Sequence, residues 1–127
     1  MPAVCLDTSA ILTLRDDEPG AERVAMVLEG LDLCFACFFK RMEALYRVWK
    51  EGERSGRLAD EQLQSLPIQW VDQTEPLLLE ASRIKASHPL SVADAWIAAT
   101  ALLSRATLLH KDPEFEAITQ LDQSWLA

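Results

Sequence analysis

Short apolar runs alternate along this chain with longer stretches in which apolar residues recur every three or four positions. The short runs predict buried strands, and the periodic stretches predict amphipathic helices. We expect strands at residues 3–6, 33–36, 68–71 and 107–110, with 121–126 as a candidate edge strand. We expect helices at residues 9–14, 21–29, 38 to about 56, 58–66, 76–87, 91–105 and 113–118. This alternation predicts an α/β fold in which helices cover both faces of a parallel sheet.

Length and composition fit one compact domain. The chain has 127 residues, half of them apolar, so residues 1–127 can share a single packed core. The net charge is −8, from 20 acidic and 12 basic side chains. A nucleic-acid-binding protein usually needs a basic surface. With a net charge of −8, a nucleic-acid-binding protein would need its negative charge compensated locally, either by bound cations or by clustered basic residues.

The cysteines and the apolar runs indicate a protein of a reducing compartment. Cys34 and Cys37 have the C-x-x-C spacing of a redox motif, but they and Cys5 lie in apolar runs, so we expect buried structural thiols. No run approaches the roughly 18 apolar residues of a membrane span. The N-terminal apolar stretch lacks a basic segment and is broken by Asp7. We therefore expect a cytoplasmic protein without a membrane segment.

Four acidic residues lie where a strand passes into a helix or near a helix start. They are Asp7, Glu43, Asp94 and Asp112. In parallel sheets the ligand site lies at the carboxyl ends of the strands, and Asp7 and Asp112 follow strands directly. Carboxylate oxygens are the ligands that Mg²⁺ and Mn²⁺ prefer. The set predicts a metal-dependent phosphodiester hydrolase, most simply a ribonuclease.

Each carboxylate also has a purely structural interpretation. Asp7 and Asp112 stand where a side chain can cap a helix. Glu43 is spaced to pair with Arg47 on the same helix, and the segment SVAD, which ends at Asp94, fits a capping box. The helix that begins there is apolar nearly all round, so the Asp94 carboxylate should be buried. A bound cation would stabilise it more than the helix N-terminus does.

These motifs resemble those of the PIN domain ribonucleases. The resemblance covers residues 4–115, and its strongest segments are CLDTSAIL, EPGAERV, VADAWIAATALL and LLHKDPEFEAI. In length the chain is most similar to the VapC-type toxins of bacterial toxin–antitoxin pairs. The resemblance implies a three-layer α/β/α PIN-like domain with a central parallel sheet.

The resemblance also implies a site and a chemistry. The family's metal-binding acidic residues are matched by Asp7, Glu43, Asp94 and Asp112. Ser9 matches the small hydroxyl residue that positions the first aspartate or the metal's water. One or two Mg²⁺ or Mn²⁺ ions would activate water for in-line attack on an RNA phosphate. The implied protein is an endoribonuclease toxin that a cognate antitoxin holds inactive.

Two further partners follow from this interpretation. An acidic pocket attracts cations, and a guanidinium can bridge two carboxylates, so we expect the antitoxin to insert an Arg into the pocket. A homodimer is expected from the resemblance and because two-fold dimers are the commonest assembly. The expected long helix also carries more aromatic residues than one helix needs for its own core, which favours an interface: Phe38, Phe39 and Trp49.

The chain departs from the family pattern at two places. His110 stands where the family usually carries Thr or Ser, and Phe39-Lys40-Arg41 replaces smaller residues before Glu43. His110 is the best support for an alternative, a PIN-fold binding module that has lost catalysis, and measuring the affinity for Mn²⁺ would separate it from the enzyme. A phosphatase of the haloacid dehalogenase type is disfavoured because Ser9 stands where it needs a second aspartate. A receiver domain is disfavoured because Asp7 has no acidic neighbour in its motif.

Half of all Lys and Arg residues fall between positions 40 and 57. The spacing of Lys40, Arg47, Lys50, Arg54 and Arg57 places them on one face of the expected long helix. One interpretation is a phosphate track, with contacts from Lys40, Arg47 and Lys50 leading RNA to the metal. The alternative is an ordinary solvated basic face, which many helices have.

Overall fold

A computed structural model describes residues 3–30 and 32–126 and contains a five-stranded sheet. In order across the sheet, the strands are β3 (Gln69–Val71), β2 (Leu33–Cys37), β1 (Ala3–Leu6), β4 (Thr107–His110) and β5 (Gln123–Trp125). Every neighbouring pair of strands is parallel. The helices are α1 (Thr8–Arg15), α2 (Ala21–Glu29), α3 (Phe38–Trp49), α4 (Glu53–Ser65), α5 (Glu75–Ser87), α6 (Val92–Leu103) and the 3₁₀ helix η1 (Pro113–Ala117). The predicted α/β class with a central parallel sheet is confirmed.

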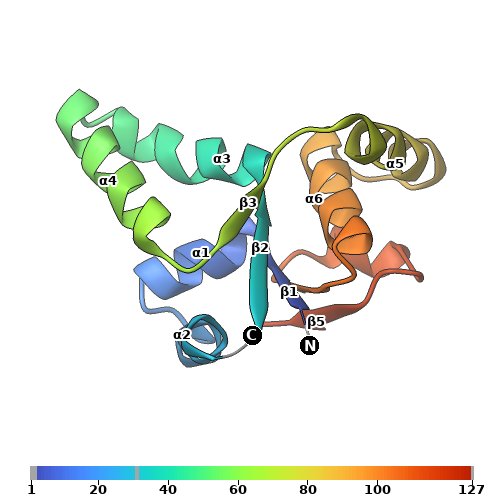
Figure 1. The fold of residues 1–127 in the computed structure, drawn as a ribbon, viewed down its shortest axis with the longest axis horizontal. Coiled ribbons are helices and arrows are strands. Elements are labelled where there is room, and N and C mark those ends of the chain that lie inside the picture. The colour runs from blue at the N-terminus through green and yellow to red at the C-terminus, as the bar shows by residue number, and fades with distance from the viewer. Residues whose placement is uncertain (1–2, 31, 127) are drawn as a thin grey trace.

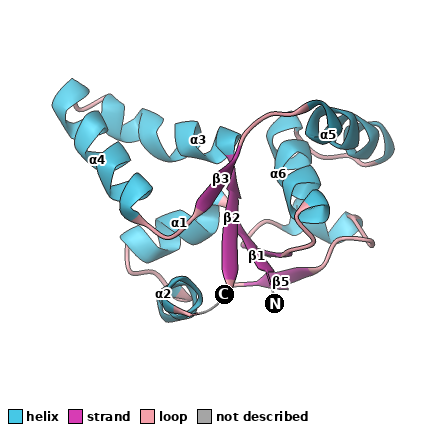
Figure 2. Cartoon of the chain, in the orientation of Figure 1, coloured by secondary structure: helices cyan, strands magenta, loops and turns pink. Residues whose placement is uncertain are grey.

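The sheet separates two groups of helices (Figures 1 and 2). Helices α1 to α4 lie on one side, and α5 and α6 lie on the other. Each side has its own hydrophobic cluster, because successive strand residues point to opposite faces. In β1, Cys5 belongs to the cluster under α5 and α6, whereas Val4 and Leu6 belong to the cluster under α1 and α2. Three layers result, as the sequence predicted.

The strand order brings the carboxyl ends of β1 and β4 together. These strands are neighbours, with Leu6 opposite Leu109. Asp7 follows β1 directly, Asp112 follows β4 after Lys111, and each aspartate is followed by a helical segment. The backbone N–H of Asp7 donates to the carbonyl of Leu109 at 3.1 Å, which ties the end of β1 to β4. The topology therefore places two distant acidic residues at one edge of the sheet.

The expected helix from Phe38 to about Gly56 is wrong. Helix α3 ends at Trp49, and α4 begins at Glu53 after a tight turn. Gly52 has φ +134°, a left-handed conformation that glycine adopts without steric cost. Gly56 instead lies inside α4 against Trp49, where an added Cβ would be 2.2 Å from the indole Cε3. The two helices form a hairpin, joined by Arg41 Nε and Nη2 to the Asp60 carboxylate at 2.7 and 2.6 Å.

This break also overturns the single basic face. Arg54 and Arg57 lie on α4, whereas Arg47 lies on α3 and Lys50 follows α3 in the turn, so one helix does not carry the five basic residues. Arg47 and Lys50 both lie over the ring of Tyr46, 5.7 and 5.6 Å from its centroid.

Two of the three aromatic residues named for a dimer interface pack within the chain. Phe38 and Phe39 pack against the core cluster under α5 and α6, and the rings of Phe38 and Trp96 meet edge to face at 5.4 Å. Trp49 remains 43% exposed.

The three cysteines are free and buried, which confirms them as structural thiols. Burial raises the pKa of the Cys5 and Cys37 thiols, so both stay protonated. None of the helices in the described ranges has the length and apolarity that a bilayer crossing requires.

Candidate metal centre

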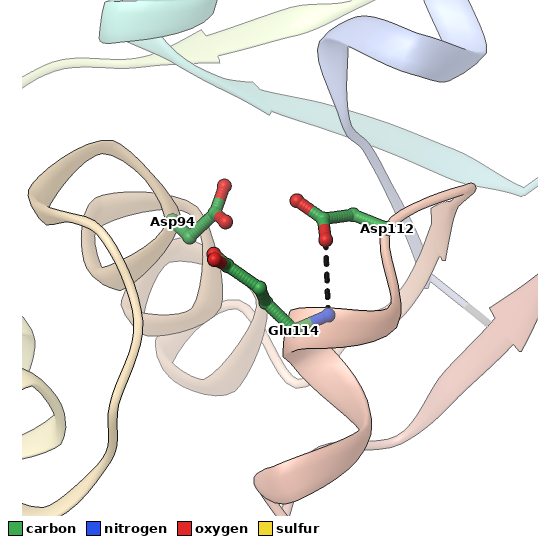
Figure 3. A group of neighbouring side chains, drawn as sticks. All are labelled: Asp94, Asp112 and Glu114. Atoms are coloured by element: carbon green, nitrogen blue, oxygen red, sulfur yellow. Dashed lines mark hydrogen bonds between the residues drawn. The ribbon is translucent and has the colours of Figure 1, made fainter.

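Three carboxylates converge beside the carboxyl end of β4. Asp94, Asp112 and Glu114 each offer an oxygen, and these oxygens all lie within 4.8 Å of one another. Asp94 projects from the start of α6, and the other two come from the loop and 3₁₀ helix after β4 (Figure 3). Sequence reasoning selected Asp94 and Asp112 but missed Glu114. Its position two residues after Asp112, in DPE at a helix start, was the available signal.

Local hydrogen bonds fix the backbone around these carboxylates. Asp112 caps η1, and its Oδ1 accepts from the backbone N–H of Glu114 at 2.9 Å (Figure 3). The predicted capping role of Asp112 is thus confirmed, and its carboxylate still faces Asp94 and Glu114. At α6 the hydroxyl of Ser91 accepts from the backbone N–H of Asp94 at 3.1 Å. The reverse contact of a full capping box is not formed, so the Asp94 carboxylate remains directed at its acidic neighbours.

Burial, together with the neighbouring carboxyl groups, raises the pKa of Asp94 to about 8. Burial is the largest cause, because the carboxylate loses its hydration. Contacts with Glu114 and Asp112 and the nearby charge of Asp7 add to the effect. Asp94 is only 7% exposed. A buried carboxyl beside other carboxylates is stabilised as an anion when a cation joins it, which is the electrostatic condition of a metal site.

Asp7 lies near this cluster, close enough for its charge to act on Asp94, and it does not act as a side-chain cap. It stands at the N-cap position of α1, but its carboxylate makes no capping hydrogen bond. Oδ2 accepts from Ser9 Oγ at 2.8 Å, and Ser9 Oγ in turn accepts from the backbone N–H of Lys111 at 3.2 Å. Ser9 therefore connects the loop after β1 to the loop after β4. Oδ1 of Asp7 is buried and receives no hydrogen bond of good geometry from the described residues. The Lys40 ammonium lies 3.2 Å from this oxygen and offsets its charge.

Glu43 pairs with Lys40 and not with Arg47. The Lys40 ammonium donates to Glu43 Oε1 and lies 3.2 Å from Asp7 Oδ1. Burial alone would lower the pKa of Lys40, but Asp7 and Glu43 raise it above its ordinary value. Thr8 Oγ1 also approaches Glu43 Oε1, at 3.4 Å. Lys40 is 4% exposed, so the expected phosphate contact from this residue is wrong.

His110 supports the loop that carries Asp112. Its Nδ1 accepts from the backbone N–H of Asp112 at 3.0 Å, so its other nitrogen, Nε2, is assigned the proton that it donates to Gln123 Oε1 at 2.8 Å. Gln123 Nε2 donates in turn to the carbonyl of Phe115 at 2.8 Å. The imidazole is 1% exposed and packs against Phe115 and Trp125. His110 thus provides the polar contact that shapes this loop.

The comparisons with known proteins identify the family. The PIN domain model matches residues 4–121, and the chain belongs to the PIN domain family. No curated protein sequence matches the chain significantly.

Several solved structures share the fold. VapBC-1 from nontypeable Haemophilus influenzae is 26% identical, with a TM-score of 0.78 and 98% of each chain covered. DNA-bound VapBC from Salmonella typhimurium is 19% identical, with a TM-score of 0.79 over the full length of both chains. FitAcB from Neisseria gonorrhoeae is 21% identical, with a TM-score of 0.72, covering 94% of this chain and 95% of that one.

Proposed function

We propose that the chain is a single-domain, Mg²⁺- or Mn²⁺-dependent endoribonuclease and the toxin of a type II toxin–antitoxin pair. The carrying observation is the convergence of Asp94, Asp112 and Glu114, with Asp7 near enough that its charge helps to raise the pKa of Asp94. Membership of the PIN domain family and the fold shared with VapBC proteins support the same conclusion.

The proposed ligands come from four carboxylates chosen on sequence and one added by the structure. Asp94, Asp112 and Glu114 would hold the ion directly. Asp7 and Glu43 belong to the proposed set as well, although both now contact Lys40. A bound divalent ion supplies an activated water and offsets charge on the phosphate. Among the chain's own groups, Ser9 holds Asp7 and His110 holds the Asp112 loop, so both preserve the geometry that binding requires.

Cleavage of RNA by the purified chain tests this proposal. We expect cleavage with Mg²⁺ or Mn²⁺, none with EDTA, and a loss of at least 100-fold in Asp94→Asn, a rough scale for removing a central charge stabiliser. Asp17→Asn is the matched control, because Asp17 is exposed and outside the pocket. Equal rates in wild type and Asp94→Asn would refute the assigned site.

One observation favours the second candidate, a PIN-fold binding module without catalysis. The ammonium of Lys40 already lies between Asp7 and Glu43, where a catalytic ion could bind. This module would bind its partner yet cleave no RNA from a total cellular pool with either metal. Cleavage that depends on Asp94 would exclude it.

A cognate antitoxin is the proposed protein partner. Structures of VapBC from Salmonella typhimurium and of a toxin–antitoxin complex from Klebsiella pneumoniae share this fold. We propose that the antitoxin inserts an Arg into the acidic pocket, because a guanidinium can bridge two carboxylates. Replacing that Arg with Ala should relieve inhibition more than it weakens binding. Unchanged inhibition after replacement of every basic residue of the antitoxin would refute this mode.

A homodimer is also proposed. Helix α3 presents an apolar face, here called the α3 face, formed by Met42, Tyr46 and Trp49, which are 52%, 43% and 43% exposed. Together with Phe38 and Leu45 these residues line an open groove on the hairpin. Adjacent exposed apolar side chains of this kind are typical of protein interfaces.

A further inference from the structure

Lys40 is buried in an unusual position for its residue type. Among the residues that the structure describes, it is the one Lys or Arg side chain in the buried class. A buried ammonium is costly unless it is paired. Its two partners are Asp7 and Glu43, and it reaches Glu43 from one turn earlier on α3. The first turn of α3 thus places a permanent cation in the acidic pocket.

This cation divides the acidic pocket into two halves. In the first half, the ammonium lies between Asp7 Oδ1 and Glu43 Oε1. In the second, the oxygens of Asp94, Asp112 and Glu114 lie within 4.8 Å of one another, and no described Lys or Arg forms an ion pair with them. One half therefore already holds a cation that offsets one of its two negative charges, whereas no described Lys or Arg is ion-paired in the other half.

We propose that Lys40 determines how many divalent ions this chain binds: it occupies the Asp7–Glu43 half, so that one ion binds, held by Asp94, Asp112 and Glu114. This inference rests on the proposed metal-dependent function. A second ion between Asp7 and Glu43 would meet the ammonium at contact distance, and two like charges at that separation repel strongly in a buried site. Lys40 is thus a specificity-determining residue for metal stoichiometry.

The first test compares metal binding to wild type and Lys40→Met. Methionine keeps much of the length of lysine but carries no charge. Titration calorimetry with MnCl₂ should give one Mn²⁺ per wild-type chain and two per Lys40→Met chain. Electron paramagnetic resonance should show an isolated Mn²⁺ in wild type and a spin-coupled pair in the variant. Lys85→Met is the matched control and should bind one ion, because Lys85 is exposed on α5.

A second test first compares two variants that keep Lys40 in place, and this comparison does not depend on the folding of Lys40→Met. Glu114→Gln should weaken Mn²⁺ binding at least tenfold, because Glu114 belongs to the half that holds no ammonium. Glu43→Gln should change it less than threefold, because Lys40 already engages Glu43. The same asymmetry should disappear in the Lys40→Met background, where Glu43 becomes free to bind an ion.

The outcomes separate this inference from the proposed function. One ion in both wild type and Lys40→Met, with equal affinity, would overturn the role of Lys40 and leave a metal-dependent enzyme intact. Two ions in wild type, or equal losses from Glu43→Gln and Glu114→Gln, would also overturn it. No Mn²⁺ binding to any variant would overturn both the inference and the proposed metal-dependent function.

Discussion

At the scale of single residues, the acidic cluster consists of carboxyl groups whose ionised forms are destabilised by burial and by mutual repulsion. Asp94 experiences this most, because its carboxyl is buried at a helix start beside Asp112 and Glu114. The helix N-terminus favours an anion there, but burial and the neighbouring carboxyl groups favour the protonated acid. The balance gives a pKa of about 8.

This raised pKa predicts how the stability of the metal-free protein depends on pH. An Asp in the unfolded chain has a pKa of about 3.9. Between that value and about 8, the folded state holds a proton on Asp94 that the unfolded state has lost. Stability therefore falls as pH rises through this window. We expect urea unfolding in EDTA to give a higher free energy of unfolding at pH 5 than at pH 8, with Asp94 contributing on the order of a few kcal/mol.

Asp94→Asn is the comparison for that measurement. Asparagine keeps the shape of the side chain and does not titrate, so the variant should lose most of the difference between the two pH values. Equal pH dependence of stability in wild type and variant would mean that the pKa of Asp94 is not raised in the folded state.

His110 gives a second prediction at this scale. His110→Ala removes a buried ring that packs against Phe115 and also removes the acceptor of the Asp112 N–H. We expect a loss of about 2–4 kcal/mol in the free energy of unfolding, together with weaker Mn²⁺ binding. His88→Ala is the control, since His88 is partly exposed at the end of α5 and should cost about 1 kcal/mol or less. A fully stable His110→Ala protein would contradict the supporting role of this residue.

At the scale of elements, the α3–α4 hairpin depends on the turn that the sequence pattern concealed. Gly52 has φ +134° and no heavy atom within 4 Å of an added Cβ, so a substitution there is strained by its backbone alone. Gly52→Ala should lower the free energy of unfolding by about 1–2 kcal/mol. Arg54→Ala, at an exposed position of α4, should change it by about 0.5 kcal/mol or less. Equal effects of the two substitutions would show that the turn carries no strain.

At the scale of the whole molecule, metal binding should stabilise the fold. An ion bound by the folded state alone adds stability by mass action, by about 2.7 kcal/mol at a hundredfold excess over Kd. Thermal melts should therefore show a higher midpoint with Mn²⁺ than with EDTA. The increase should be lost in a variant that combines Asp94→Asn with Asp112→Asn. Identical midpoints in wild type would favour the non-catalytic binding module.

Assembly is the second prediction at this scale. If two copies meet through the α3 face, light scattering should give twice the 14.2 kDa chain mass at micromolar concentration. Met42→Arg places a charge at the centre of that face and should yield a monomer, because an unpaired buried charge is costly. Leu79→Arg, at a 60% exposed position on α5, should remain dimeric. A monomeric wild type would refute the homodimer.

The sequence by itself determined the α/β class, the bounds of most elements and two of the converging carboxylates. These follow from local physics: strand alternation, helical periodicity, and capping residues at Asp112 and Ser91. Glu114 was within reach of the same reasoning. The sequence misplaced the end of the helix after β2, because residues 50–57 contain no apolar side chain and so no periodicity that would mark where one helix ends and the next begins. The left-handed turn at Gly52 shows only in the backbone of the structure.

The tertiary structure decided what the acidic pocket holds. Nothing in the spacing of residues distinguishes a lysine on a solvated helix face from one whose ammonium lies between Asp7 and Glu43. That difference depends on how α3 lies against the end of β1, some 35 residues away along the chain, where Thr8 meets Glu43. The same holds for His110, whose role depends on the partner strand that brings Gln123 to it. Long-range packing sets these environments, so the three-dimensional arrangement placed one residue of the predicted basic track, Lys40, in a buried ion-paired cluster.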